Sequence, residues 1–217
     1  MMTYGHGGDI YSYSGDRVLL DFSSNINPLG LPPAVEKAFQ ASIGACTVYP
    51  DPHCRAISEK IGEYENVPSE SILCGNGAAD LIYRIAYGLK PKKALLFAPT
   101  FSEYEQAVRQ SGGAVYYYDL REENEFVPEH DFLQMLDSTQ PDIVFLCNPN
   151  NPTGKTVSKA LMTETAVWCQ NNNAVLVIDE CFLDFVRNRK ALSMIGKTEK
   201  NPNIIVLKAF TKFFAMA

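Results

Sequence analysis

Two charged residues stand where the surrounding pattern is apolar. Lys212 lies among phenylalanines in the run FTKFF, shortly after the apolar stretch 204–207, and Asp179 ends the run AVLVID. Lysine is rarely buried without a partner, and a desolvated lysine with a lowered pKa is a good nucleophile toward aldehydes. A buried carboxylate also needs a partner, and a protonated ring nitrogen would serve. The pair therefore suits a cofactor with an aldehyde and a basic ring.

Three further features fit the same kind of ligand. Gly75-Asn76-Gly77 precedes an apolar helical pattern, so backbone N–H groups and a helix dipole are available to a phosphate. Phe101 can stack on a flat ring, and Asn151 in NNPTG can hydrogen-bond a ring hydroxyl. Taken singly, these residues are also typical of turns and of an ordinary core. Together with Lys212 and Asp179 they indicate a site for pyridoxal 5′-phosphate (PLP).

The elements that must position these residues follow an α/β rhythm. Helices are expected at 33–43, 54–64 and 158–171, and in TFSEYEQAVRQSGG, PEHDFLQMLDST and LIYRIAYGL. Strands are expected at 72–74, 93–97, 142–147, 174–178 and 204–207, in AVYYYDL, and in the short apolar run LLDF. Apolar strands that alternate with amphipathic helices predict a mostly parallel sheet with helices on both faces. The five features come after strands, at the carboxyl ends where such sheets bind ligands.

Composition excludes several classes of function. The chain has 217 residues, 46% of them hydrophobic, and a net charge of −6, which argues against a nucleic-acid partner and an anionic membrane surface. No apolar run reaches the length of a membrane span, and no signal peptide pattern is visible. The six cysteines are scattered and the three histidines lie far apart, which predicts reduced thiols, a cytoplasmic location and no metal site.

The motifs NPNNPTG, VIDECFLDF and FTK, in this order, resemble the fold-type I PLP-dependent aminotransferase superfamily. The segments HGGDIYSYSGDRVLLDFSSNINPLG and TKFFA are similar to the L-threonine-O-3-phosphate decarboxylase family of cobalamin biosynthesis. That family is closely related to the histidinol-phosphate aminotransferases. The resemblance covers nearly all of the chain and implies a PLP-binding large domain.

The resemblance also implies a role for each candidate residue. Lys212 would bind the cofactor aldehyde covalently, Asp179 would pair with the pyridine nitrogen, and Phe101 would stack on the ring. Asn151 would hydrogen-bond the ring oxygen and lie near the substrate carboxylate. The phosphate would be held by Gly75, Asn76, Gly77, Ala78 and Thr211, and by Tyr49 of the neighbouring subunit in a homodimer. The substrate would contact His6, Gly7 and Asn25. A histidine so close to a terminus can equally belong to a poorly ordered segment with no role in binding.

The sequence departs from the superfamily pattern at three places. Phe182 stands where the aminotransferases usually carry tyrosine, which favours the decarboxylase group. Lys208 and Ala209 replace a common arginine and serine, so one phosphate-binding hydroxyl is missing. The chain ends at Ala217, before the segments that supply the substrate arginines in the family. We therefore expect a C-terminally truncated chain: an N-terminal arm and helix at 1–45, a PLP-binding large domain at 46–217, and no C-terminal small domain.

The expected activity is that of a carboxy-lyase that decarboxylates O-phospho-L-threonine to aminopropanol phosphate. A histidinol-phosphate-type aminotransferase and an inactive fragment that only binds PLP are the alternatives. A dinucleotide-binding oxidoreductase is poorly supported, because GNGAAD lacks the third glycine of the G-x-G-x-x-G motif.

Overall fold

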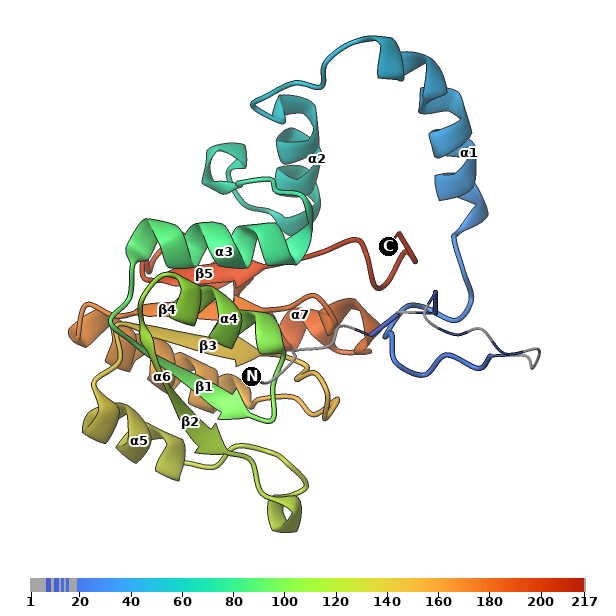
Figure 1. Ribbon diagram of the computed structural model, residues 1–217. Coiled ribbons are helices and arrows are strands. Elements are labelled where there is room, and N and C mark those ends of the chain that lie inside the picture. Colours follow the sequence, from blue (N-terminus) through green and yellow to red (C-terminus); the bar gives the residue numbers. More distant parts are fainter. Residues whose placement is uncertain (1–6, 9, 12, 14, 16–18, 217) are drawn as a thin grey trace. The chain divides into compact units, whose positions relative to one another are not determined.

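The computed structural model describes residues 7–8, 10–11, 13, 15 and 19–216 (Figure 1). The chain divides into two compact units, each described here by itself. The first unit consists of Met1–Ile43 and Phe210–Ala217, and the second of Gly44–Ala209. The expected division into an arm at 1–45 and a large domain at 46–217 remains a prediction.

The second unit is built on a five-stranded parallel sheet. Its strands are β1 (Lys93–Ala98), β2 (Ala114–Asp119), β3 (Ile143–Cys147), β4 (Val175–Asp179) and β5 (Ile204–Leu207). Their order in the sheet is β2-β1-β3-β4-β5, and each neighbouring pair is parallel. The chain leaves β1 on one side to form β2 and returns on the other side to form β3. The carboxyl ends of β1 and β3 therefore flank a topological switch point, where ligands bind in folds of this kind.

Helices cover both faces of the sheet. The helices of this unit are α2 (Arg55–Glu65), α3 (Gly77–Leu89), α4 (Ser102–Gln110), α5 (Asp131–Thr139), α6 (Lys159–Asn171) and the short α7 (Arg189–Leu192). One buried cluster joins α3 and α4 to the face that carries Phe145 and Cys147, and another joins α5 and α6 to the face that carries Val144 and Leu146. This alternation along β3 confirms the predicted sheet buried on both faces.

Short 3₁₀ turns lie at Ile43–Thr47, Ser69–Ser71, Glu122–Asn124, Leu183–Phe185 and Ile195–Lys197. No helix in the described part of the chain is long and apolar enough to cross a membrane.

The first unit holds α1 (Pro33–Ser42) and the segment that carries Lys212. A proline in the first turn suits the start of α1, because that position needs no backbone N–H. The backbone N–H of Asn27 donates to the carbonyl of Lys212 at 3.1 Å, and the Asn27 side-chain amide donates to the carbonyl of Phe213 at 2.8 Å. The chain before α1 is thereby tied to the backbone around Lys212.

Two predicted strands are absent from the structure. Ile72 is extended, with φ −106° and ψ 125°, but residues 72–74 pair with no strand of the sheet, and Leu73 is 69% exposed. The run LLDF also forms no strand, and Phe22 is exposed. An apolar pattern marks a segment that can form a strand, but a strand also needs a partner to complete its hydrogen bonds. The other predicted helices and strands are confirmed to within a few residues at their ends.

Candidate active site

Asp179 is the last residue of β4 and is only 4% exposed. Its Oδ2 accepts a hydrogen bond from the hydroxyl of Tyr104 at 2.6 Å, and its Oδ1 accepts one from the backbone N–H of Cys181 at 2.9 Å. Both partners are neutral, and within the described residues no cation forms an ion pair with this carboxylate. The end of β4 therefore presents a buried carboxylate that suits a cationic ligand.

Tyr104 is a site residue that the sequence analysis did not identify. It lies on α4, has no exposed surface, stacks on Phe145 at 5.0 Å between ring centroids, and meets Phe101 edge-on at 5.6 Å. Burial, and then the charge of Asp179, raise the pKa of Tyr104 well above its ordinary value, so its hydroxyl keeps the proton that it donates. Tyr104 thus contacts both Phe101, the predicted stacking residue, and Asp179, the predicted partner of the cofactor ring nitrogen. Its position in the first turn of α4, just after the capping residue Phe101, was the available signal.

The surroundings of Asp179 are poorly hydrated. Cys147 ends β3, is the sheet partner of Asp179, and is 2% exposed. Burial, and secondarily the charge of Asp179, raise the pKa of the Cys147 thiol to about 12. The thiol therefore stays protonated at neutral pH, and its sulfur lies 3.2 Å from the carbonyl oxygen of Pro149.

The asparagines of NPNNPTG divide into two groups. Asn148 is buried and accepts from the backbone N–H of Val157 at 3.0 Å. Asn150 is also buried, donates to the carbonyl of Pro99 at 3.0 Å, and accepts from the hydroxyl of Thr100 at 2.8 Å. These bonds join the loops that follow β1 and β3 at the switch point. Asn151 is only half-buried on the same loop and stays the predicted ligand.

The loop Gly75-Asn76-Gly77 requires glycine at two positions. Gly77 has φ +79°, and a Cβ on Gly75 would lie 2.6 Å from a methyl carbon of Leu81. Two N–H groups of the loop are engaged within it: that of Asn76 donates to Asp80 Oδ2 at 2.9 Å, and that of Gly77 to the Gly75 carbonyl at 3.0 Å. These two N–H groups are therefore not available to a phosphate in this arrangement, and the N–H of Ala78 is the next one along the turn.

The glycine loop lies at the carboxyl end of the sheet. A short connection joins the last turn of α3 to the start of β1, so the first turn of α3 lies near the ends of the strands (Figure 1). The second unit thus places the glycine loop, Phe101, Asn151 and Asp179 at one edge. Tyr49 belongs to the same unit, and its side chain is 98% exposed. Phe182 lies just beyond Asp179 with its ring 6.4 Å from that of Phe185.

The remaining predicted residues belong to the first unit. Lys212 and Thr211 are half-buried, and Asn25, two residues before Asn27, is exposed. Gly7 packs so closely on Ser23 that a Cβ would lie 1.7 Å from the Ser23 carbonyl oxygen. His6 lies outside the described residues.

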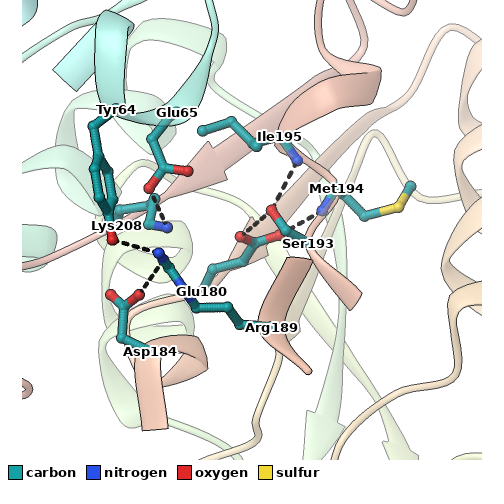
Figure 2. A network of polar contacts seen from close by, with 9 residues as sticks. All are labelled: Tyr64, Glu65, Glu180, Asp184, Arg189, Ser193, Met194, Ile195 and Lys208. Atoms are coloured by element: carbon teal, nitrogen blue, oxygen red, sulfur yellow. Dashed lines mark hydrogen bonds and ion pairs between the residues drawn. The ribbon is translucent and has the colours of Figure 1, made fainter. Parts of the chain in front are cut away.

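A second polar cluster begins at Glu180, directly after Asp179. We call it the Glu180 network, and its members are Tyr64, Glu65, Glu180, Asp184, Arg189, Ser193, Met194, Ile195 and Lys208 (Figure 2). A cavity of about 300 Å³ adjoins it and is lined by residues that include Tyr64, Arg189 and Lys208. None of the predicted cofactor-binding residues lines this cavity.

Comparison with known proteins places this geometry in context. Residues 17–217 match the family "Aminotransferase class I and II". The chain is 37% identical to the threonine-phosphate decarboxylase of Salmonella typhimurium, over 97% of this chain and 58% of that protein.

Two solved structures resemble the fold. The histidinol-phosphate aminotransferase from Clostridium acetobutylicum has a TM-score of 0.81 and 30% identity, over 91% of this chain and 57% of that one. The histidinol-phosphate aminotransferase from Sinorhizobium meliloti, solved with PLP, has a TM-score of 0.80 and 20% identity, over 89% and 52% of the two chains.

The chain spans about 58% of the length of the threonine-phosphate decarboxylases that it matches. The family match includes the parallel sheet, Asp179 and Lys212. This chain belongs to the class I and II aminotransferase family.

Proposed function

We propose that this protein is a PLP-dependent carboxy-lyase of cobalamin biosynthesis that decarboxylates O-phospho-L-threonine to aminopropanol phosphate. The 37% identity to a threonine-phosphate decarboxylase supports the reaction. Phe182 adds support, because the aminotransferases usually carry a tyrosine at this position and the decarboxylase group often carries phenylalanine.

Asp179 is the observation that carries the cofactor assignment. Its carboxylate is buried, oriented by two neutral donors, and without a cationic partner in the described part of the chain. A protonated pyridine nitrogen would supply the missing positive charge, and the resulting ion pair would keep that nitrogen protonated. The residues present therefore fit PLP.

The other residues hold the cofactor around this contact. Phe101 would stack on the ring, Asn151 would donate to the ring oxygen, and the turn from Gly75 to Ala78 would hold the phosphate with Thr211. Lys212 would be the amine that binds the aldehyde. Asp179 pairs in the sheet with Leu207, and Lys212 follows Leu207 by five residues, which supports this role.

When bound, PLP supplies an aldehyde for an amine and a ring that accepts the electrons of a bond broken at the substrate α carbon. The protein decides which bond breaks, because only the bond perpendicular to the ring overlaps its π system. Asn151 would lie near the substrate carboxylate, which must stand out of the ring plane for its bond to break. His6, Gly7 and Asn25 would contact the rest of the substrate.

A homodimer in the cytoplasm is part of this proposal. Tyr49 would reach the cofactor phosphate of the partner subunit, which agrees with its full exposure in a single chain. Val48, next to it, is 69% exposed and would gain an apolar partner surface. The six cysteines are all free thiols, as is usual in a reducing compartment.

A histidinol-phosphate-type aminotransferase is the second candidate. It is favoured by the TM-score of 0.81 and 30% identity to a solved member of that group. Purified protein with PLP should be given O-phospho-L-threonine, and separately histidinol phosphate with 2-oxoglutarate. Release of CO₂ in the first assay is the expected result. Amino transfer to 2-oxoglutarate without CO₂ release would reject the decarboxylase in favour of the aminotransferase, and PLP retention without either reaction would indicate binding only.

A further inference from the structure

Lys208 directly follows β5 and pairs with an acid that is largely shielded from solvent. Its Nζ forms an ion pair with Glu65 Oε1 at 2.6 Å, and the two side chains are only 22% and 12% exposed (Figure 2). Glu180, which has no exposed surface, is its second acidic neighbour, and the charge of Lys208 acts on the Glu180 carboxyl. The Lys208 ammonium group thus pairs with the Glu65 carboxylate, and its charge also acts on the Glu180 carboxyl, which belongs to another segment.

These two acids are themselves fixed in place. Glu65 is the last residue of α2. Glu180 accepts from the hydroxyl of Ser193 and from the backbone N–H of Met194, each at 2.7 Å, and its own N–H donates to the carbonyl of Leu207 at 2.9 Å. The Lys208–Glu65 ion pair therefore connects the exit of β5 to the end of α2, and the backbone bond from Glu180 to Leu207 joins the exits of β4 and β5.

The position of Lys208 in the chain gives this connection a consequence for the active site. Three residues separate Lys208 from Lys212, so an extended chain keeps their Cα atoms within about 14 Å of each other. When Lys208 is fixed, only the short segment between Lys208 and Lys212 can move, and this limits the positions that the Lys212 amine can reach. A mobile Lys208 would let the strand end fray and would spread the amine over a larger volume.

We propose that Lys208 is a positioning residue that holds the exit of β5 against Glu65 at the end of α2 and thereby sets the reach of the Lys212 amine toward the cofactor aldehyde. This inference rests on the proposed function. Lys208 itself touches neither cofactor nor substrate in this account.

Two measurements separate positioning from general structural support. The first is equilibrium binding of 4′-deoxypyridoxine 5′-phosphate, which lacks the aldehyde and depends on Asp179 and the phosphate loop. The second is the rate at which the protein captures PLP covalently, followed by absorbance and by borohydride trapping. Lys208→Met should slow capture roughly 10- to 100-fold, because a misplaced amine loses its near-attack geometry. Binding of the analogue should stay within about twofold, as expected for an independent site.

Three further variants complete the test. Lys208→Arg keeps the charge and should restore most of the capture rate. The double variant Glu65→Gln with Lys208→Met removes both charges of the pair, so it keeps the test valid if the single variant folds poorly, and its capture should also be slow. Arg189→Met is the matched control, because Arg189 lines the same cavity but forms its ion pair with Asp184, at 2.6 Å, and not with Glu65. Its capture rate should be close to that of the unmodified protein.

Each other outcome has a definite meaning. Unchanged capture in Lys208→Met and in the double variant overturns the inference, and so does an equal loss of capture and analogue binding. Equal slowing in Arg189→Met would assign the effect to the cavity as a whole and would also overturn it. If the unmodified protein binds the analogue but captures no PLP, the proposed function fails, and this inference fails with it.

Discussion

Asp179 and Glu180 are adjacent buried carboxylates at the end of one strand, yet their surroundings differ. Successive strand residues point to opposite faces, so Asp179 meets Tyr104 of α4, whereas Glu180 meets Ser193 and Met194. Each accepts one hydroxyl and one backbone N–H. Glu180 also has the charges of Lys208 and Lys159 nearby, whereas the hydrogen-bond partners of Asp179 are neutral.

This difference separates a structural acid from a ligand-binding one. A buried charge is tolerated when the protein itself compensates it, as around Glu180. A buried charge that the protein orients but leaves without a cation is suited to a cationic ligand. The comparison therefore assigns Glu180 to the framework and Asp179 to the cofactor, and both assignments can be tested.

The largest expected effect is on cofactor affinity. Asp179→Asn keeps the shape of the side chain but removes its charge, and the loss of a buried charge pair should weaken PLP binding roughly 30- to 3,000-fold. The affinity can be measured by titration of the apoprotein. Glu180→Gln is the matched control and should bind PLP almost normally. Equal weakening in both variants would remove the distinction between the two acids.

The next effect is on stability. Glu180→Ala leaves the Ser193 hydroxyl and the Met194 N–H without their acceptor and opens a cavity, so the free energy of unfolding should fall by about 2–4 kcal/mol. Urea unfolding measures this loss. Glu180→Gln retains an acceptor and should lose less. A Glu180→Ala protein as stable as the unmodified one would contradict a framework role.

Tyr104→Phe should have a smaller effect, and it should change both cofactor affinity and stability. It removes the hydroxyl from Asp179 but keeps the ring packing on Phe145, which should cost about 1–2 kcal/mol of stability. It should also weaken binding of 4′-deoxypyridoxine 5′-phosphate roughly tenfold, because the carboxylate is less well oriented. Tyr87→Phe, at a half-exposed position on α3, is the control. Unchanged analogue binding in Tyr104→Phe would show that the hydroxyl does not orient Asp179.

The smallest effect is a pH dependence of stability. Burial is the largest influence on Glu180 and raises its pKa above the usual 4.5, although its hydrogen bonds and nearby lysines oppose the shift. Above pH 4.5 the unfolded chain releases this proton before the native state does. This contribution to stability is therefore complete below pH 4.5 and is lost as pH rises through the native pKa, with a slope of at most about 1.4 kcal/mol per pH unit.

The check is a difference measurement. Stability curves of the unmodified protein and Glu180→Gln should differ in slope only in that pH window, whereas the exposed substitution Glu70→Gln should leave the slope unchanged. If stability changed with pH equally steeply in Glu180→Gln and in the unmodified protein, Glu180 would titrate as an ordinary carboxyl.

The sequence predicted the sheet well because its signals are local. Apolar runs such as that of β3 are buried on both faces, and the polar residues after them necessarily gather at the carboxyl ends of a parallel sheet. The segment 72–74 shows the limit of this reasoning. Its pattern is that of a strand, but strand formation depends on a hydrogen-bonding partner elsewhere in the chain.

Parts of the site depend on contacts that no local pattern reveals. Tyr104 and Asp179 are 75 residues apart in the chain, and their hydrogen bond exists only because α4 packs over β3 and β4. Similarly, the sequence shows Lys208 only as a replacement of the arginine that is common in the family, whereas the structure shows that it forms an ion pair with Glu65. Sequence patterns identified candidate residues, and long-range packing decided which groups support them.

The most direct test of the central claim is to locate the covalently bound cofactor. The protein should be incubated with PLP, reduced with borohydride, digested and mapped by mass spectrometry, with Lys212→Ala as the control. We predict that the label lies on the peptide that contains Lys212 and disappears in the variant. Labelling of another lysine, or undiminished labelling of the Lys212→Ala protein, would contradict the account.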